Sequence, residues 1–402
     1  MAFTEVTLAL AGGIGEQVSF LGRGLAIASD GTIWAAYYKT VGANSQIFVA
    51  YSIDGGTTWT EEQVTADANN HRYPSIAIDS SDILHLSYNA RGRAPWPLAW
   101  GVFYTQRVAG VWSAEETVSL LNTGGSIPDT TIAIDSLDNI HFLFGSKGYG
   151  VNSGQWNVQY RMRNAGGGYG AVQLITDVAA AQSTVSMAID GADAVHIAWW
   201  GLGWGTHPAR NQIMYGLGPG AWATEIVLDE DVDDEYPSIV VDSAGKPHVG
   251  WVNGAGALAN RHLRYSNKVG AGWSDPLQID VSGSVDLSPL TMSIDKTNDI
   301  HFIYTAMSLV PSGMLNEHYR KIQDGILQDQ IQLTADAAQN QGWPSMLWAT
   351  WPLIGTRRTN VLNFPKVVWR SFNDAIKFGY FPATSGLQGS ILITKRIYRT
   401  LN

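Results

Sequence analysis

Tryptophan, arginine and histidine side chains gather in the longest and least repetitive stretches of this 402-residue chain. Aromatic rings beside planar guanidinium groups are suited to binding sugar rings that carry acidic substituents. The same residue types are enriched where proteins contact one another, so a protein interface is an equal alternative. The side chains predicted to bind the ligand are Arg91, Arg93, Trp96, Trp100, Trp156, Trp200, Trp204, His207 and Arg210.

An acidic run, Asp-Glu-Asp-Val-Asp-Asp-Glu, occupies positions 229–235. Calcium requires several oxygen ligands, and Asp231, Asp233 and Asp234 are the candidates to supply them. The commoner role of such a run is a solvated, charged surface. Calcium therefore stays a weak candidate, and no other cofactor is predicted.

Five histidines each follow an aspartate by six residues, the first pair being Asp79 and His85. Imidazoles are common metal ligands, but these five would have to converge from separate segments to share one ion. The alternative is a His–Asp or His–backbone hydrogen bond that locks a hairpin in each segment. We predict this structural role. The other four pairs are Asp135 with His141, Asp190 with His196, Asp242 with His248, and Asp295 with His301.

The aspartates of these pairs are 56, 55, 52 and 53 residues apart. Such a period, with several short strands in each unit, is typical of a propeller or solenoid. Degenerate copies near both ends bring the units to seven, and residues 73–121 contain four strand-like segments. The sequence therefore predicts an all-β fold, a single β-propeller domain over residues 1–402 with seven four-stranded antiparallel blades. The expected inner strands lie near residues 25, 75, 131, 186, 238, 291 and 345.

The N-terminal segment 5–10 has the pattern of a fourth strand, although it precedes the first inner strand. We expect it to complete the last blade and close the ring, which hides the sheet edges. This leaves residues 391–394 unassigned. They are either the outer strand of the last blade or part of a C-terminal docking tail over residues 389–402.

The composition excludes several partners. The net charge of −10 argues against nucleic acid, and no apolar run is long enough to span a membrane. The chain has no cysteine, which excludes disulfides and thiol catalysis. Its N-terminus lacks the basic end and apolar stretch of a signal peptide.

The segment Ser52-Ile-Asp54-Gly-Gly56-Thr-Thr-Trp59 resembles the Asp box of BNR-repeat, sialidase-like β-propellers. The resemblance implies a structural hairpin away from the active face. In it, the Asp54 side chain accepts backbone N–H bonds and the Trp59 ring packs between neighbouring sheets.

Sialidase-like members of that superfamily carry an Arg-Ile-Pro motif in the first blade, and this chain does not match it. Arg23 is out of register, the proline is missing, and residues 39–44 hold no carboxylate where the acid would stand. Some BNR-repeat propellers are polysaccharide lyases, and residues 70–79 are similar to their loop-and-strand pattern. That resemblance implies His71 as base or acid and Arg72 as the group that holds a uronate carboxylate.

These observations favour a non-catalytic, lectin-like protein of a phage-type virion surface or tail. It would bind a glycan or another protein through the Trp/Arg-rich loop face. The expected partners are a cell-surface polysaccharide, other virion proteins or further copies of the chain. The expected location is extracellular or on a virion, without a signal peptide, with the cytoplasm as the alternative. The alternative function is glycan cleavage, by a polysaccharide lyase ahead of a sialidase-like hydrolase.

Overall fold

The computed structural model of the protein is built from β-strands. It describes residues 4–9, 24–93, 96–119, 129–254, 261–280, 290–307, 315–334, 341–347, 366–371 and 375–380. Within these ranges no helix is long and apolar enough to cross a membrane.

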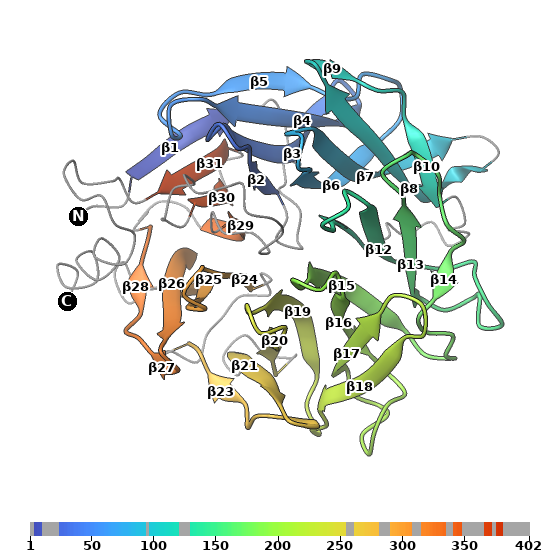
Figure 1. Ribbon diagram of the computed structural model, residues 1–402, viewed down its shortest axis with the longest axis vertical. Helices are drawn as coiled ribbons and strands as arrows, with labels where there is room; N and C mark the ends of the chain where they lie inside the picture. The colour runs from blue at the N-terminus through green and yellow to red at the C-terminus, as the bar shows by residue number, and fades with distance from the viewer. Residues whose placement is uncertain are drawn as a thin grey trace.

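The strands form seven antiparallel sheets that are arranged around a common centre, with the first strand of each unit innermost (Figure 1). The first sheet contains β2 (Leu25–Ile27), β3 (Ile33–Val41), β4 (Asn44–Ser52) and β5 (Thr60–Gln63). The second contains β6 (His71–Ile78), β7 (Leu84–Arg93), β8 (Trp96–Val108), β9 (Val111–Trp112) and β10 (Glu116–Ser119). The third contains β11 (Asp129–Ile134), β12 (Ile140–Ser146), β13 (Asn157–Arg163) and β14 (Gln173–Leu174).

The remaining sheets repeat this order. The fourth contains β15 (Gln182–Ile189), β16 (Val195–Gly201), β17 (Gln212–Gly218) and β18 (Ala223–Leu228). The fifth contains β19 (Asp234–Val241), β20 (Pro247–Asn253), β21 (His262–Val269), β22 (Gly272–Trp273) and β23 (Leu277–Gln278). The sixth contains β24 (Thr291–Ile294), β25 (Ile300–Met307), β26 (Leu315–Gln323), β27 (Ile326–Leu327) and β28 (Ile331–Gln332).

The seventh sheet joins the two ends of the chain. It contains β29 (Gln341–Leu347), β30 (Lys366–Ser371), β31 (Ala375–Tyr380) and β1 (Thr4–Ala9). Thr4 pairs with Tyr380, and Thr7 pairs with Lys377. The predicted all-β propeller, closed by its N-terminal strand, is therefore confirmed. The single-domain extent of residues 1–402 stays a prediction, as does the docking tail at 389–402, which lies outside the described residues.

Each of the five histidines lies between its own aspartate and a tyrosine of the third strand. In the second sheet, His85 Nε2 is 3.2 Å from Asp79 Oδ2, and His85 Nδ1 is 2.7 Å from the Tyr104 hydroxyl oxygen. These bonds join the first three strands of one sheet, so the predicted structural role is confirmed. The equivalent histidine–tyrosine pairs are His141 with Tyr160, His196 with Tyr215, His248 with Tyr265, and His301 with Tyr319.

In the third sheet, hydrogen bonds also lower the pKa of the aspartate. Burial alone would raise the pKa of Asp135, but hydrogen bonds from His141 and Asn139 outweigh it and lower that pKa to about 2. In the first sheet Trp34 takes the histidine position, and its ring lies 4.8 Å from that of Tyr51. An aromatic contact there replaces the hydrogen-bonded triad.

The turn after each aspartate ties neighbouring sheets together. Asp138 has left-handed backbone (φ 61°) and accepts bonds from the Ser80 backbone N–H at 2.9 Å and its hydroxyl at 2.6 Å. Asp82 and Asp193 repeat this contact with serines of the preceding sheet. Asn298 takes the same position in the sixth sheet. The fifth sheet has Gly245 there instead, so this side-chain link is absent between the described turns of the fourth and fifth sheets.

Replacing Asp138 with alanine is expected to lower the free energy of unfolding by about 2 kcal/mol, because both bonds to Ser80 disappear while a Cβ remains in left-handed backbone. Asparagine, which the chain itself uses at position 298, should cost less than about 0.5 kcal/mol. Glycine, used at position 245, should fall between them because it relieves the backbone strain. Urea unfolding of the three variants measures the order of their stabilities. An alanine variant as stable as the asparagine variant would contradict the link.

The hairpin at residues 52–59 has the hydrogen bonds predicted for it. Asp54 Oδ1 accepts the backbone N–H groups of Thr57 at 3.0 Å and Thr58 at 2.9 Å, while the Ser52 hydroxyl accepts the N–H of Gly56 at 2.8 Å. Hydrogen bonds from Thr58 lead in lowering the pKa of Asp54 to about 2. The Trp59 indole closes the turn by donating to the Gly56 carbonyl.

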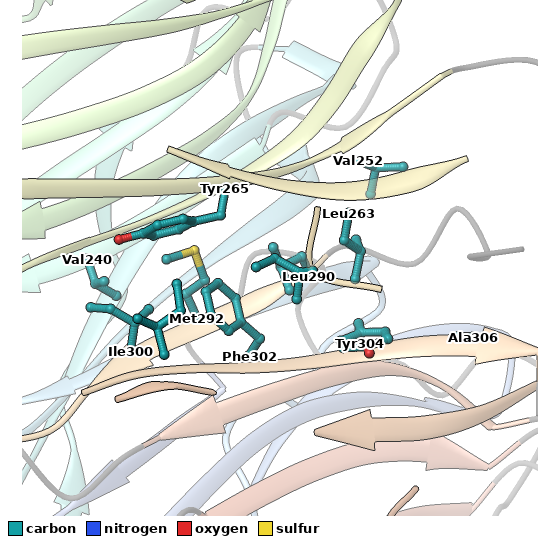
Figure 2. Close-up of a cluster of buried hydrophobic side chains, with 12 residues drawn as sticks. Val240, Val252, Leu263, Tyr265, Leu290, Met292, Ile300, Phe302, Tyr304 and Ala306 are labelled. Atoms are coloured by element: carbon teal, nitrogen blue, oxygen red, sulfur yellow. The ribbon is translucent and has the colours of Figure 1, made fainter. Parts of the chain in front are cut away.

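In later sheets the equivalent tryptophans reach the preceding sheet. Trp112 donates to Glu62 at 2.6 Å, Trp222 to Gln173 at 2.8 Å, and Trp273 to Glu225 at 3.0 Å. These bonds connect outer strands of adjacent sheets. Clusters of buried apolar side chains pack between neighbouring sheets from the first to the sixth. Figure 2 shows the one between the fifth and sixth, where Tyr265 lies edge-on to Phe302 with ring centroids 5.6 Å apart.

Candidate functional site

Near their first residues, four inner strands have a bulge in their pairing with the second strand of the same sheet. The pairing register shifts after Arg72, Ser183, Glu235 and Gly342 in β6, β15, β19 and β29. Tyr73, Thr184 and Tyr236 have left-handed backbone at these bulges, with φ between 53° and 55°. Such residues cost about 1–3 kcal/mol each, and bulges re-aim the side chains before them.

The inner strands begin at the end of the ring where the loops between second and third strands also emerge. We call this end the strand-start face. It is where the sequence predicts a ligand, and the residues before the bulges lie on it.

Arg72 is the candidate side chain with the best-defined surroundings on this face. Its side chain is half-buried, and its Nε donates to the Ser45 hydroxyl at 3.2 Å. Its guanidinium carbon lies 6.0 Å from the ring centroid of Tyr38 and 5.7 Å from that of Trp100. Both rings are buried, so they fix the guanidinium in place. Among the described residues, its two terminal nitrogens have no hydrogen-bond partner.

The structure corrects the expectation for His71. Its side chain is fully buried, with Nε2 2.9 Å from Asp67 Oδ1 and its ring 5.6 Å from that of Tyr88. A group without solvent exposure cannot exchange a proton with a bound ligand in this conformation. His71 instead supports the start of β6, next to Arg72.

Three of the predicted tryptophans gather around the start of β15. The Trp200 indole donates to the Thr184 hydroxyl at 2.9 Å, and the Trp204 indole donates to the Gln182 side chain at 2.8 Å. The Trp156 carbonyl accepts the backbone N–H of Gln182. All three side chains remain half-buried. The structure thus brings them together at one strand start.

His207 and Arg210 each contact carboxylates of the acidic run. His207 Nδ1 lies 2.9 Å from Asp229 Oδ1. Arg210 Nε donates to Asp231 at 3.0 Å, and its Nη1 lies 3.5 Å from Asp233. The acidic run therefore holds the loop at 201–211, and its carboxylates balance the charge of Arg210.

The same contacts involve the three calcium candidates, Asp231, Asp233 and Asp234, and a calcium site there stays a prediction. The first two carboxylates pair with Arg210, and the third is buried against Asn253. In the part of the chain that the structure describes, no three histidine or acidic side chains are grouped so as to hold a metal ion.

The remaining predicted ligands lie along β7 and β8. Arg91 is half-buried, and its backbone pairs with that of Trp100. Arg93 pairs with Trp96, but only the backbone of these two residues is described. A role for Arg91, Arg93 and Trp96 in binding stays a prediction.

The sequence singled out Asp234 only as a weak calcium candidate, and it did not single out Glu235, because both stand in a charged run. Asp234 is fully buried and its Oδ1 accepts the Asn253 amide at 2.7 Å. Burial raises the pKa of Asp234 to about 7. Glu235 is half-buried, and burial raises its pKa as well. The shared Tyr-Pro-Ser triplets, which place Glu235 level with Arg72, were the signal that could have found them.

Replacing Asp234 with asparagine is expected to stabilise the fold, and more so as the pH rises. The folded pKa of about 7 lies above the ordinary aspartate pKa of 3.8, so folded Asp234 holds a proton that the unfolded chain releases between these values. Stability is therefore lost as the pH rises through this window, by about 4 kcal/mol when complete. Asparagine keeps the bond to Asn253 without this loss. Urea unfolding at pH 5 and pH 8 measures the difference, and an equal effect at both pH values would contradict it.

Comparison with known proteins supports the propeller. No family model and no curated protein matches the chain. Among solved structures, 93% of it superposes on 95% of a PL25 ulvan lyase, a polysaccharide lyase, at 13% identity and a TM-score of 0.64. A PL25 ulvan lyase bound to a GlcA(1-4)Rha3S repeat gives 12% identity, the same coverage and a TM-score of 0.63. An α-L-arabinofuranosidase from Fusarium graminearum gives 14% identity and 0.53, over 80% of this chain and 99% of that one.

The chain is thus a β-propeller of the architecture used by glycan-processing enzymes. These similar structures overturn the expectation of a non-catalytic, virion-associated binding protein, because a lyase and a glycosidase share nearly the whole fold. At this identity the likeness establishes the fold alone, and the activity of this chain is a separate question.

Proposed function

We propose that this protein cleaves an acidic polysaccharide, with the strand-start face as its active face. The observation that carries the proposal is Arg72, a guanidinium fixed between Tyr38 and Trp100 with its terminal nitrogens turned to no described partner. Guanidinium groups bind carboxylate or sulfate through two parallel hydrogen bonds. A pre-fixed group loses little entropy when it does so.

The likeness to ulvan lyase supports elimination as the reaction, in place of hydrolysis. A lyase must hold a sugar carboxylate while a proton leaves the adjacent carbon, and a fixed cation suits that task. The half-buried tryptophans around β15 offer aromatic surface for further sugar rings on the same face.

The test is a panel of polymers incubated with the purified chain. It includes ulvan, pectin, alginate and a glycosaminoglycan, with arabinan as the neutral member. Absorbance of unsaturated uronate and product mass report the reaction. Unsaturated products from one or more acidic polymers are expected. Products one water heavier would replace the lyase with a hydrolase, and an intact panel would overturn glycan cleavage.

A further inference from the structure

Glu235 on β19 occupies the position that Arg72 occupies on β6. Each is the second residue of its inner strand, is half-buried, and precedes a left-handed tyrosine followed by proline and serine. Each also reaches the preceding sheet, Arg72 through Ser45 and Glu235 through Asn211. The same backbone device thus presents a cation on one sheet and a carboxyl group on another.

The surroundings of Glu235 leave one of its oxygens open. Its Oε1 accepts the Asn211 amide at 3.0 Å. Among the described residues, its Oε2 has no hydrogen-bond partner. Asn211 is itself fixed, because its backbone N–H donates to Asp233 and its carbonyl accepts the N–H of Asp234. The carboxyl group is therefore oriented by one oxygen while the other stays available.

The surroundings of Glu235 raise its pKa above that of an ordinary glutamate. Burial raises its pKa, with a smaller contribution from Asp233, while the Asn211 hydrogen bond and the charge of Arg261 oppose the rise. The adjacent Asp234 is buried and has a pKa raised to about 7. A carboxylate with a raised pKa is a stronger base than an ordinary glutamate and a more persistent acid.

We propose that Glu235 is a catalytic residue that carries the proton between the sugar carbon and the glycosidic oxygen during cleavage. This rests on the proposed function. The free oxygen takes the proton from the carbon beside the sugar carboxylate, and the electron pair of that C–H bond forms the new C=C bond. The glycosidic C–O bond breaks, and its electron pair stays on the oxygen. That oxygen then takes the proton from Glu235, which returns to its carboxylate form, so no other reactant is consumed.

The test compares Glu235→Gln with Glu230→Gln on the polymer that the parent protein cleaves. Both changes remove one negative charge from the same acidic run, but Glu230 lies ahead of the strand start. We expect Glu235→Gln to lower kcat by about 100-fold or more with KM within a few-fold, and Glu230→Gln to match the parent. Thermal unfolding of both variants reports whether the fold is kept.

Two further readouts separate proton transfer from a structural role. Glu235→Asp should keep part of the activity and the acidic limb of the pH–rate profile, which Glu235→Gln should lose. Added formate should restore turnover to Glu235→Ala, because a free carboxylate can enter the vacated space. If the parent cleaves a polymer and Glu235→Gln keeps its kcat, or loses only affinity, the role of Glu235 is overturned and the proposed function stands. If the parent cleaves nothing, both fall.

Discussion

Replacing Arg72 with glutamine is expected to lower kcat/KM on an acidic polysaccharide by about 100-fold. The variant loses both terminal nitrogens that face no described partner, and with them the charge that neutralises the sugar carboxylate. Arg72→Lys should recover only part of the loss. Its ammonium keeps the charge but lacks the planar fork that binds two oxygens at once. Initial rates of product formation measure the effect.

The control removes a cation from the opposite end of the ring. Lys296 is exposed in the turn after β24, far along the strand from the strand-start face, so Lys296→Gln should leave kcat/KM within about twofold. Rising salt should lower the kcat/KM of the parent protein more than that of Arg72→Gln, because only the parent has this charge contact to be screened. If Arg72→Gln and Lys296→Gln reduced activity equally, binding by Arg72 would be refuted in favour of a general effect of net charge.

The fold was predictable because the sequence signals for it are local and repeated. The Asp-to-His spacing of six residues and the turn between them recur in five segments, so each copy supports the others. The fourth-strand pattern at the N-terminus, out of order in the chain, predicted ring closure, which the pairing of β1 with β31 confirms. Repeated short-range signals of this kind need no knowledge of distant contacts.

The partners of these residues were harder to predict, because they depend on contacts between separate strands and sheets. The recurring third-strand tyrosine was visible, but its bond to the histidine requires both strands in register. The serine that bonds Asp138 lies 58 residues away, in the preceding sheet. No spacing rule within one repeat identifies such a pair.

The site shows the same limit. Arg72 was identified through its local pattern, whereas the burial that removes His71 from direct chemistry depends on how the second sheet packs against the first. Arg210 was expected to meet a ligand, and the carboxylates that pair with it lie 21 and 23 residues further along the chain. Composition identified a charged run there, but the pairing that neutralises it arises only when the fourth sheet forms.

Deleting residues 1–10 is expected to lower the free energy of unfolding by more than about 4 kcal/mol, a size that single substitutions rarely reach. β1 is the outer strand of the seventh sheet, and the chain continues from it into the first sheet. Without β1, β31 presents unpaired backbone groups along its length, and the covalent link that closes the ring is gone. Urea unfolding should show a lower midpoint, and size-exclusion chromatography should show association through the open edge.

A synthetic peptide of residues 1–10 should restore the midpoint of the deleted protein, because it can pair with β31 in the same antiparallel register. A peptide of the same composition in scrambled order should not. This rescue separates loss of the closing strand from a general effect of truncation, since the peptide returns the hydrogen bonds without the covalent link. The stability that the peptide fails to restore then measures the contribution of the covalent link itself. A deletion that left the midpoint unchanged would show that the ring is held by contacts between its sheets alone.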